Sequence, residues 1–218
     1  MIDIGADEYW QAPIDAKLTA YGQPIELNRM IVTAAFDGAF YVESDDRTSG
    51  IRVENANHGM AVGMRANVAG SPSGNVNGER CIVATAVSRS GVGSVAPILL
   101  TNSALGGGRL GWQEAVWGWR LVGDDPVRTW TFDVGLNNIG LLVTTTGTVK
   151  QIDTAAPAAW FVIDDGSGVN VKVVVPEGVA VGSVGQQVRV TGISSCERSD
   201  IELHRALRVR TQSDISAL

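Results

Sequence analysis

Apolar and polar residues alternate along most of this chain, as they do in β-strands that bury one face. In SDIELHRALRVR (199–210), the odd-numbered positions from Ile201 to Val209 form one face and the even-numbered positions form the other. Helical spacing is absent from the longer windows, and we expect only a helical turn within 177–184. The pattern therefore predicts an all-β protein.

A stretch of this pattern occurs twice, about 120 residues apart. FYVESDDRTSGIRV (40–53) matches WFVIDDGSGVNV (160–171), and the later segments VGMRANVAG and VGQQVRVTG also correspond. Each copy closes with a further alternating strand, at 79–89 and 199–210. We therefore expect two units of five short strands, each about 70 residues long.

This layout resembles the OB fold, in particular bacterial OB-fold modules of the secreted or cell-surface type. Their second hairpin reads aromatic–aromatic–V–x–D–D–x–S–G–I/V–x–V. The matching residues are Phe40, Tyr41, Val42, Asp45, Asp46, Ser49, Gly50, Ile51 and Val53 in the first copy, and Trp160, Phe161, Val162, Asp164, Asp165, Ser167, Gly168, Val169 and Val171 in the second. The resemblance covers about 23–92 and 139–212. It implies two five-stranded OB-like Greek-key barrels, and it indicates fold more than function.

The repeated DDRTSG and DDGSG segments are interpreted as hairpin turns. Asp accepts local backbone hydrogen bonds in turns, and Gly supplies positive φ. A calcium site is the alternative, but it needs six or more oxygens and Glu43, Asp45 and Asp46 are only three carboxylates. We expect no metal here, and the calcium alternative stays open.

Alternation also predicts which side chains point out of the barrels. With the apolar residues of each hairpin inside, the outer faces show Tyr41 and Arg52 in the first copy and Phe161 and Lys172 in the second. Proteins that bind single strands stack bases on aromatic rings beside cations. These four residues are therefore the candidate face for single-stranded nucleic acid or an oligosaccharide.

The repeats divide the chain into an N-terminal arm (1–22), a first barrel (23–92), a linker (93–138) and a second barrel (139–218). Five of the six tryptophans lie outside the barrels. In the linker, AVWGWRLVGDDPVRTWTFDV (115–134) predicts a β-hairpin with one aromatic face. The predicted fold is thus two barrels and an inter-barrel aromatic hairpin.

An aromatic hairpin is marginal in water, so something must cover it. Three covers are open: the chain's own barrels, another subunit, or a sugar or base bound to an open platform. The N-terminal arm raises the same question, since an extended arm can join a neighbour's sheet edge. The candidate self-association residues are Tyr9, Trp10, Trp112, Trp117, Trp119, Trp130 and Phe132.

Composition disfavours a protein that mainly neutralises phosphates. Charged residues make up 18%, the net charge is −6 and the pI is about 4.9. No run of 18 apolar residues could span a membrane. Cys81 and Cys196 fit either one bridge or two buried free thiols.

No catalytic constellation is evident. His58 and His204 belong to different copies, and HExxH, GxSxG and CxxC motifs are absent. We therefore expect no enzyme, no catalytic residue and no cofactor. The start of the sequence lacks the basic and apolar regions of a signal peptide. We expect an extracellular or cell-surface location, with the signal peptide removed or not included, and a cytoplasmic location as the alternative.

These observations favour a non-catalytic structural or interaction module that associates with copies of itself, as an extracellular polymer or filament subunit. The alternative is an OB-fold binding module for single-stranded nucleic acid or an oligosaccharide. Aromatics outside the barrels favour assembly, whereas an aromatic and basic barrel face would favour ligand binding.

Overall fold

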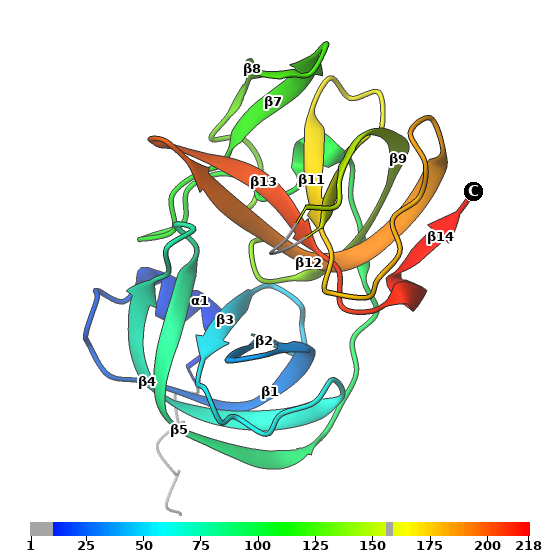
Figure 1. Cartoon of the computed structure of the whole chain (residues 1–218). Coiled ribbons are helices and arrows are strands. Elements are labelled where there is room, and N and C mark those ends of the chain that lie inside the picture. Colours follow the sequence, from blue (N-terminus) through cyan, green and yellow to red (C-terminus); the bar gives the residue numbers. More distant parts are fainter. Residues whose placement is uncertain (1–10, 156–158) are drawn as a thin grey trace, which may run out of the picture.

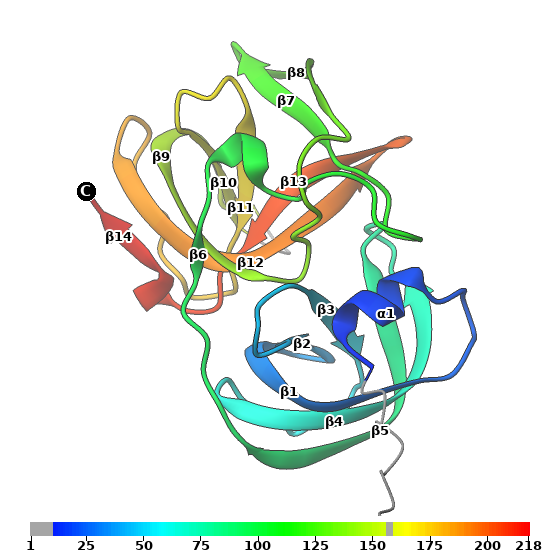
Figure 2. The same cartoon turned by 180° about the vertical axis from the view of Figure 1, so that it is seen from behind.

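The computed structural model of this chain describes residues 11–155 and 159–218, apart from the side chains of Trp130 and Thr131. Two β-barrels lie against each other, and a β-hairpin projects from the second barrel on the side away from the first (Figure 1). Figure 2 shows the same arrangement from behind, with the short helix α1 against the first barrel.

The first barrel closes in the strand order β1-β2-β3-β5-β4. Its strands are β1 (Ile25–Phe36), β2 (Ala39–Glu43), β3 (Gly50–Glu54), β4 (Met64–Gly74) and β5 (Arg80–Val92). β3 and β5 are parallel, and the other neighbours are antiparallel. Phe40, Val42, Ile51 and Val53 fill the interior, as the alternation predicts.

The second barrel repeats this order. Its strands are β9 (Leu142–Asp153), β10 (Trp160–Asp164), β11 (Asn170–Val174), β12 (Gln187–Ser199) and β13 (Glu202–Arg208). β9, β10, β11, β13 and β12 pair in turn, β12 returns to β9, and β11 and β13 are the parallel pair. The predicted fold class, two five-stranded OB-like barrels, is confirmed.

The remaining elements lie around the second barrel. They are β6 (Ile98–Leu99), the 3-10 turn η1 (Asn102–Ala104), β7 (Trp117–Val122), β8 (Asp125–Phe132), the 3-10 turn η2 (Gln212–Asp214) and β14 (Ile215–Ala217). β7 and β8 form the predicted hairpin, and β7 also pairs with β13 at His204. The hairpin therefore extends the sheet of the second barrel rather than bridging the two barrels.

The helix α1 (Pro13–Leu18) was not predicted, because six residues are too few to show helical periodicity. Pro13 begins it, and the Asp15 carboxylate accepts the Ala12 backbone N–H (2.7 Å). Ala16 is buried in the core of the first barrel and Lys17 is buried against Asn137 and Ile139, so this part of the arm packs on its own chain. Within 177–184 the chain forms a β-turn, closed by Val179 N–H on Pro176 C=O (3.2 Å), and no helix. No helix among the described residues is long and apolar enough to cross a membrane.

The barrels meet at a glycine of the repeated turn. A Cβ on Gly50 would clash with the carbonyl group of Gly140, whose own φ is +94°. In the second copy, Gly168 has φ +80°, and a Cβ there would meet no atom within 4 Å. Gly50 therefore begins β3 and allows close backbone approach, whereas Gly168 lies in the turn two residues before β11 and adopts a left-handed conformation.

We expect Gly50→Ala to destabilise the protein by about 1–3 kcal/mol, because the new methyl group would push two backbones apart. The matched control is Gly182→Ala: Gly182 also lacks positive φ, but its Cβ would meet only the tip of the Gln186 side chain. Urea denaturation of the two variants measures the difference. Equal stability of both would show that the barrels do not need this contact.

Candidate ligand-binding cleft

The outer face of β2 and β3 in the first barrel is buried against the second barrel. Tyr41 and Glu43 are both 0% exposed. Tyr41 packs with Ala34 of β1, Leu142 of β9 and Ile193 of β12. Tyr41, a candidate ligand residue, is therefore an interface residue that no ligand reaches in this structure.

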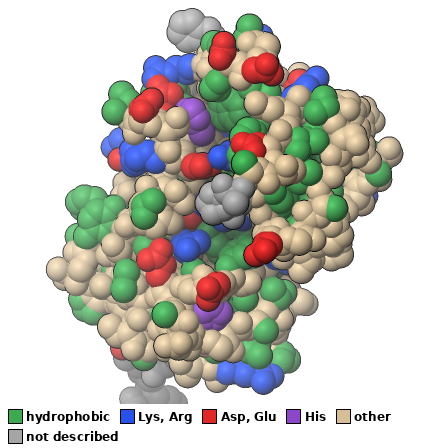
Figure 3. Space-filling model, in the orientation of Figure 1, with side chains coloured by type: hydrophobic (Ala, Val, Ile, Leu, Met, Phe, Trp, Pro, Cys, Tyr) green, Lys and Arg blue, Asp and Glu red, His purple; other side chains and the backbone are tan. Residues whose placement is uncertain are grey.

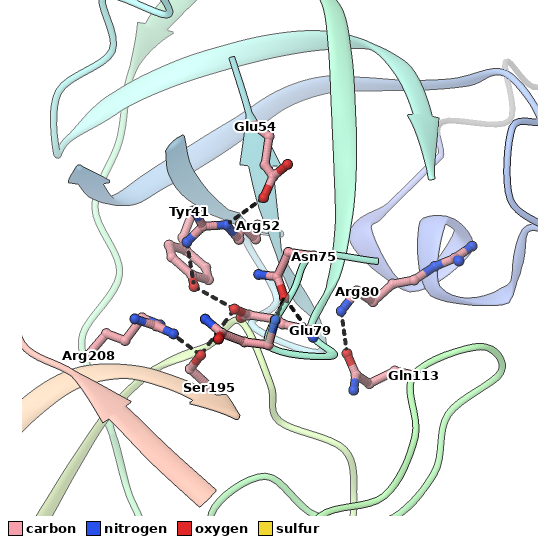
Figure 4. A network of polar contacts seen from close by, with 10 residues as sticks. Tyr41, Arg52, Glu54, Asn75, Glu79, Arg80, Gln113, Ser195 and Arg208 are labelled. Carbon is pink, nitrogen blue, oxygen red and sulfur yellow. Dashed lines mark hydrogen bonds and ion pairs between the residues drawn. The ribbon is translucent and has the colours of Figure 1, made fainter. Parts of the chain in front are cut away.

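A buried carboxylate joins the two barrels at this interface (Figure 4). The Tyr41 hydroxyl donates to Glu79 Oε2 (2.9 Å) and accepts from Arg52 Nη1 (3.3 Å). From the second barrel, the Ser195 hydroxyl donates to the same Glu79 oxygen (3.1 Å) and accepts from Arg208 Nε (3.0 Å). Arg52, the other candidate on this barrel, is therefore part of the interface network.

Two more ionisable side chains are buried close to this contact. Glu43 accepts the backbone N–H of Leu142, yet burial outweighs that bond and raises the pKa of Glu43 to about 7. Lys17 donates to the Ile139 carbonyl (2.6 Å) and to Asn137 Oδ1 (3.0 Å), and burial lowers its pKa to about 8. Both charges are costly in this interface.

In the second copy, the outer face differs by one residue from the prediction. Val162 pairs with Lys172 across β10 and β11, as Tyr41 pairs with Arg52 across β2 and β3. Phe161 therefore points into the barrel and is 0% exposed, so its placement on the outer face is wrong. A one-residue offset turns every side chain of a strand to the opposite face. Lys172 does lie on the outer face.

This outer face opens into a cleft of about 290 Å³, walled on one side by the β7–β8 hairpin. Trp160 is half-buried, and Lys172 Nζ lies 5.0 Å from the centroid of its ring. The cleft is lined by Trp119, Leu121, Asp124, Pro126, Gln151, Trp160, Val162, Lys172, Glu197, Arg198, Ser199, His204 and Arg205. Aromatic rings thus stand beside both donors and acceptors.

The hairpin is fixed to the barrel by its aromatic and polar residues. Trp119 is only 6% exposed and stacks on His204, with 5.9 Å between ring centroids. The Leu121 backbone N–H donates to Asn170 Oδ1 (2.6 Å), and Arg128 forms an ion pair with Glu202. For Trp119, the cover is therefore the chain's own barrel.

The other candidate self-association residues are spread over the molecule. Trp117 and Phe132 stack with 3.7 Å between centroids, and Phe132 is 37% exposed. Trp112 is 51% exposed and lies 5.6 Å from the Tyr21 ring, away from the cleft. Tyr9 and Trp10 lie outside the described residues, as does the side chain of Trp130.

Three of the four paired aspartates, Asp46, Asp164 and Asp165, accept hydrogen bonds within their turns, and Asp45 instead forms an ion pair with Arg65 of β4. Asp46 accepts the Ser44 hydroxyl (2.6 Å) and the Thr48 backbone N–H (3.0 Å), which hold its pKa below its usual value. Asp165 accepts the Ser167 backbone N–H (2.9 Å) in the second copy. The turn interpretation is confirmed by these bonds. The described residues contain no group of three or more His, Cys, Asp or Glu side chains placed to hold a metal ion.

Cys81 and Cys196 are free and buried. Burial raises the pKa of the Cys81 thiol to about 12 and that of Cys196 well above its ordinary value. Of the two possibilities that the sequence left open, the free thiols are the ones observed.

Of the residues that line the cleft, only Trp119 and Lys172 were candidate site residues from the sequence; Trp160, Gln151 and Glu197 are among those that were not. The correct alignment of the two copies would have found Trp160. In the structure, FYVE (40–43) corresponds to FVID (161–164), and this alignment puts Trp160 on the outer face. Matching the aromatic pairs instead shifted β10 by one position. Glu197 carried no signal, because β12 extends past its counterpart in the first copy.

No family model matches this chain, and no curated protein matches it. Solved structures of HIN domains are similar over most of its length. The tetrameric p202 HIN2 is 14% identical, over 92% of this chain and 98% of that chain, with a TM-score of 0.38. The p202 HIN1 in complex with 12-mer dsDNA is 14% identical, over 92% and 94%, with a TM-score of 0.39. A murine DNA binding protein bound with dsDNA is 9% identical, over 90% and 98%, with a TM-score of 0.38. The strand order of the barrels, rather than these scores, establishes the fold.

We expect Glu43→Gln to stabilise the protein at pH 7.5 and to leave stability unchanged near pH 4.5. The native pKa of Glu43 lies above its unfolded value of 4.5, so its contribution is most favourable below that value and is lost as the pH rises through about 7. The gain over wild type should approach about 1–3 kcal/mol.

Urea denaturation at several pH values from about 4.5 to 7.5 measures this gain. The control is Glu177→Gln, because Glu177 is exposed in a turn. A gain that is the same at all pH values, or that also appears in the control, would contradict the explanation by burial.

Proposed function

We propose that this chain is a non-catalytic binding module whose ligand site is the cleft between the β7–β8 hairpin and the outer face of β10 and β11. The ligand is a linear chain, either single-stranded nucleic acid or an oligosaccharide. One of its bases or sugar rings stacks on Trp160. One observation carries the proposal. The outer face that is buried in the first barrel stays open in the second and is walled by an aromatic hairpin.

The dimensions and the lining support this site. Its volume, about 290 Å³, is near the lower end of the about 300–1,000 Å³ typical of ligand sites. Trp119 is already fixed by His204, so the wall is preformed. Trp160 keeps part of its ring exposed beside Lys172. A rigid aromatic surface beside donors and acceptors suits a ring that is stacked and hydrogen-bonded together.

We expect Trp160→Ala to weaken ligand binding by about 5- to 150-fold, since one stacking contact contributes about 1–3 kcal/mol. The matched control is Trp112→Ala, which removes a more exposed tryptophan outside the cleft and should leave affinity unchanged. Calorimetric titration with a thymidine 12-mer, a double-stranded DNA 12-mer and neutral hexasaccharides measures both. Weaker binding by the Trp112 variant, with the Trp160 variant unchanged, would place the site elsewhere.

A second candidate function is self-association into a structural assembly. The filament and the extracellular location that we expect from the sequence are part of this candidate. The observation that favours it is an exposed apolar run that begins at the last residue of β8: Phe132 is 37%, Val134 49% and Leu136 90% exposed. Clustered apolar exposure of this kind marks interaction surfaces. Trp119 takes no part in it, because its own barrel covers it.

Under this candidate, we expect Leu136→Ser to weaken self-association by about tenfold or more, because a leucine buried in an interface contributes about 1.5–3 kcal/mol. The control is Val76→Ser, at an 89%-exposed position on the first barrel. Sedimentation equilibrium over a wide concentration range measures both. A wild-type protein that stays at 23.0 kDa throughout would remove this candidate.

A further inference from the structure

We infer that the ligand of the cleft is a neutral oligosaccharide, because each cation that lines the cleft is engaged with a carboxylate or with the backbone. This inference rests on the proposed function and names the ligand class of the same site. The lining contains three cations, Lys172, Arg198 and Arg205, and two carboxylates, Asp124 and Glu197. Whether these cations can bind a phosphate depends on the contacts that each of them already makes.

The two cations at the cleft surface are paired within the protein. Lys172 Nζ lies 2.7 Å from Glu197 Oε2, with 26% and 37% of the two side chains exposed. Arg198 Nη2 lies 3.2 Å from Glu114 Oε2. A phosphate that approached either cation would have to compete with a carboxylate already in place. Its gain from the contact would therefore be small.

Arg205 is a buried cation whose hydrogen bonds go to the backbone. Its side chain is 1% exposed, and it donates to the carbonyl groups of Leu105 (2.7 Å) and Ser103 (3.3 Å). These bonds hold the turn η1 over the end of the second barrel. Arg205 is therefore held at the base of the cleft by the backbone through Nε and Nη2, and among the described residues Nη1 has no hydrogen-bond partner.

The charges around the cleft also disfavour a polyanionic ligand. Burial lowers the pKa of His204 and so disfavours its cationic form, and His204 Nε2 lies 3.4 Å from Glu202 Oε2. Figure 3 shows acidic and basic side chains interspersed on this side of the molecule, without a broad basic area among the described residues. The net charge of −6 adds a general repulsion of polyanions.

The same groups suit a neutral sugar. A hydroxyl group both donates and accepts, and the Lys172–Glu197 pair presents a donor beside an acceptor. Gln151 adds an amide with both functions, and Ser199 adds a hydroxyl. The partly exposed ring of Trp160 offers an apolar surface to the C–H groups of a sugar ring.

The test compares neutral hexasaccharides and a broad glycan array with the thymidine 12-mer, at low and high salt. We expect glycan affinity to change less than about twofold between about 50 and 500 mM salt. A nucleic acid with two phosphate contacts would lose about 25-fold over the same range.

Glu197→Gln separates the two ligand classes further. It keeps the size of the side chain but removes a charged acceptor, so glycan binding should weaken by roughly 3- to 10-fold. Nucleic-acid binding should instead strengthen, because Lys172 loses its partner. Glu177→Gln, in an exposed turn outside the cleft, should change neither.

Each outcome decides between the claims. Salt-independent glycan binding that Trp160→Ala weakens supports the inference. Salt-dependent binding of the 12-mer, or of acidic glycans alone, overturns it and leaves the proposed binding function standing. Failure of every probe at millimolar concentration overturns the proposed function as well.

Discussion

Tyr41 and Ser195 donate to the same oxygen of Glu79, and this buried carboxylate fixes how the two repeats meet. A buried carboxylate that lost either hydroxyl would be destabilising, so the two barrels must present their donors together. The close approach of Gly50 and Gly140 allows the barrels to reach that distance. Once this contact forms, the outer face of β2 and β3 is closed, and the outer face of β10 and β11 is the one still open to a ligand.

The two copies therefore share a fold and differ in role. Each keeps the same strand order and the same apolar interior, which is what barrel closure requires. The side chains that leave the barrel are not kept: Tyr41 and Arg52 in the first copy stand where Val162 and Lys172 stand in the second. The first pair builds an interface, and the second pair forms part of a cleft. The two repeats therefore keep the same kind of interior and differ in the side chains at the surface.

Alternation and the repeat were enough to predict the barrels and the hairpin, because these depend on local patterns of burial. They could not show that Tyr41 is covered, since that depends on Leu142 and Ile193, which lie about 100 and 150 residues away. They also misplaced Phe161, because sequence similarity aligned two aromatic pairs that strand pairing separates by one residue. The short helix α1 was not predicted because its stability comes from packing against the barrel rather than from a helical pattern in its own sequence.

The contacts of the hairpin and the ion pairs beside it are the physical basis of the proposal that the ligand of the cleft is neutral. Two strands alone are marginal in water, so β7 and β8 depend on contacts with the second barrel. One of these contacts is the ion pair between Arg128 of β8 and Glu202 of β13. On the barrel side of the cleft, Lys172 of β11 pairs with Glu197 of β12, and Arg198 of β12 pairs with Glu114, which precedes β7. A cation that is paired with a carboxylate must give up part of that pairing to neutralise a phosphate. In the proposed function, stacking and hydrogen bonding rather than charge neutralisation hold the ligand in the cleft.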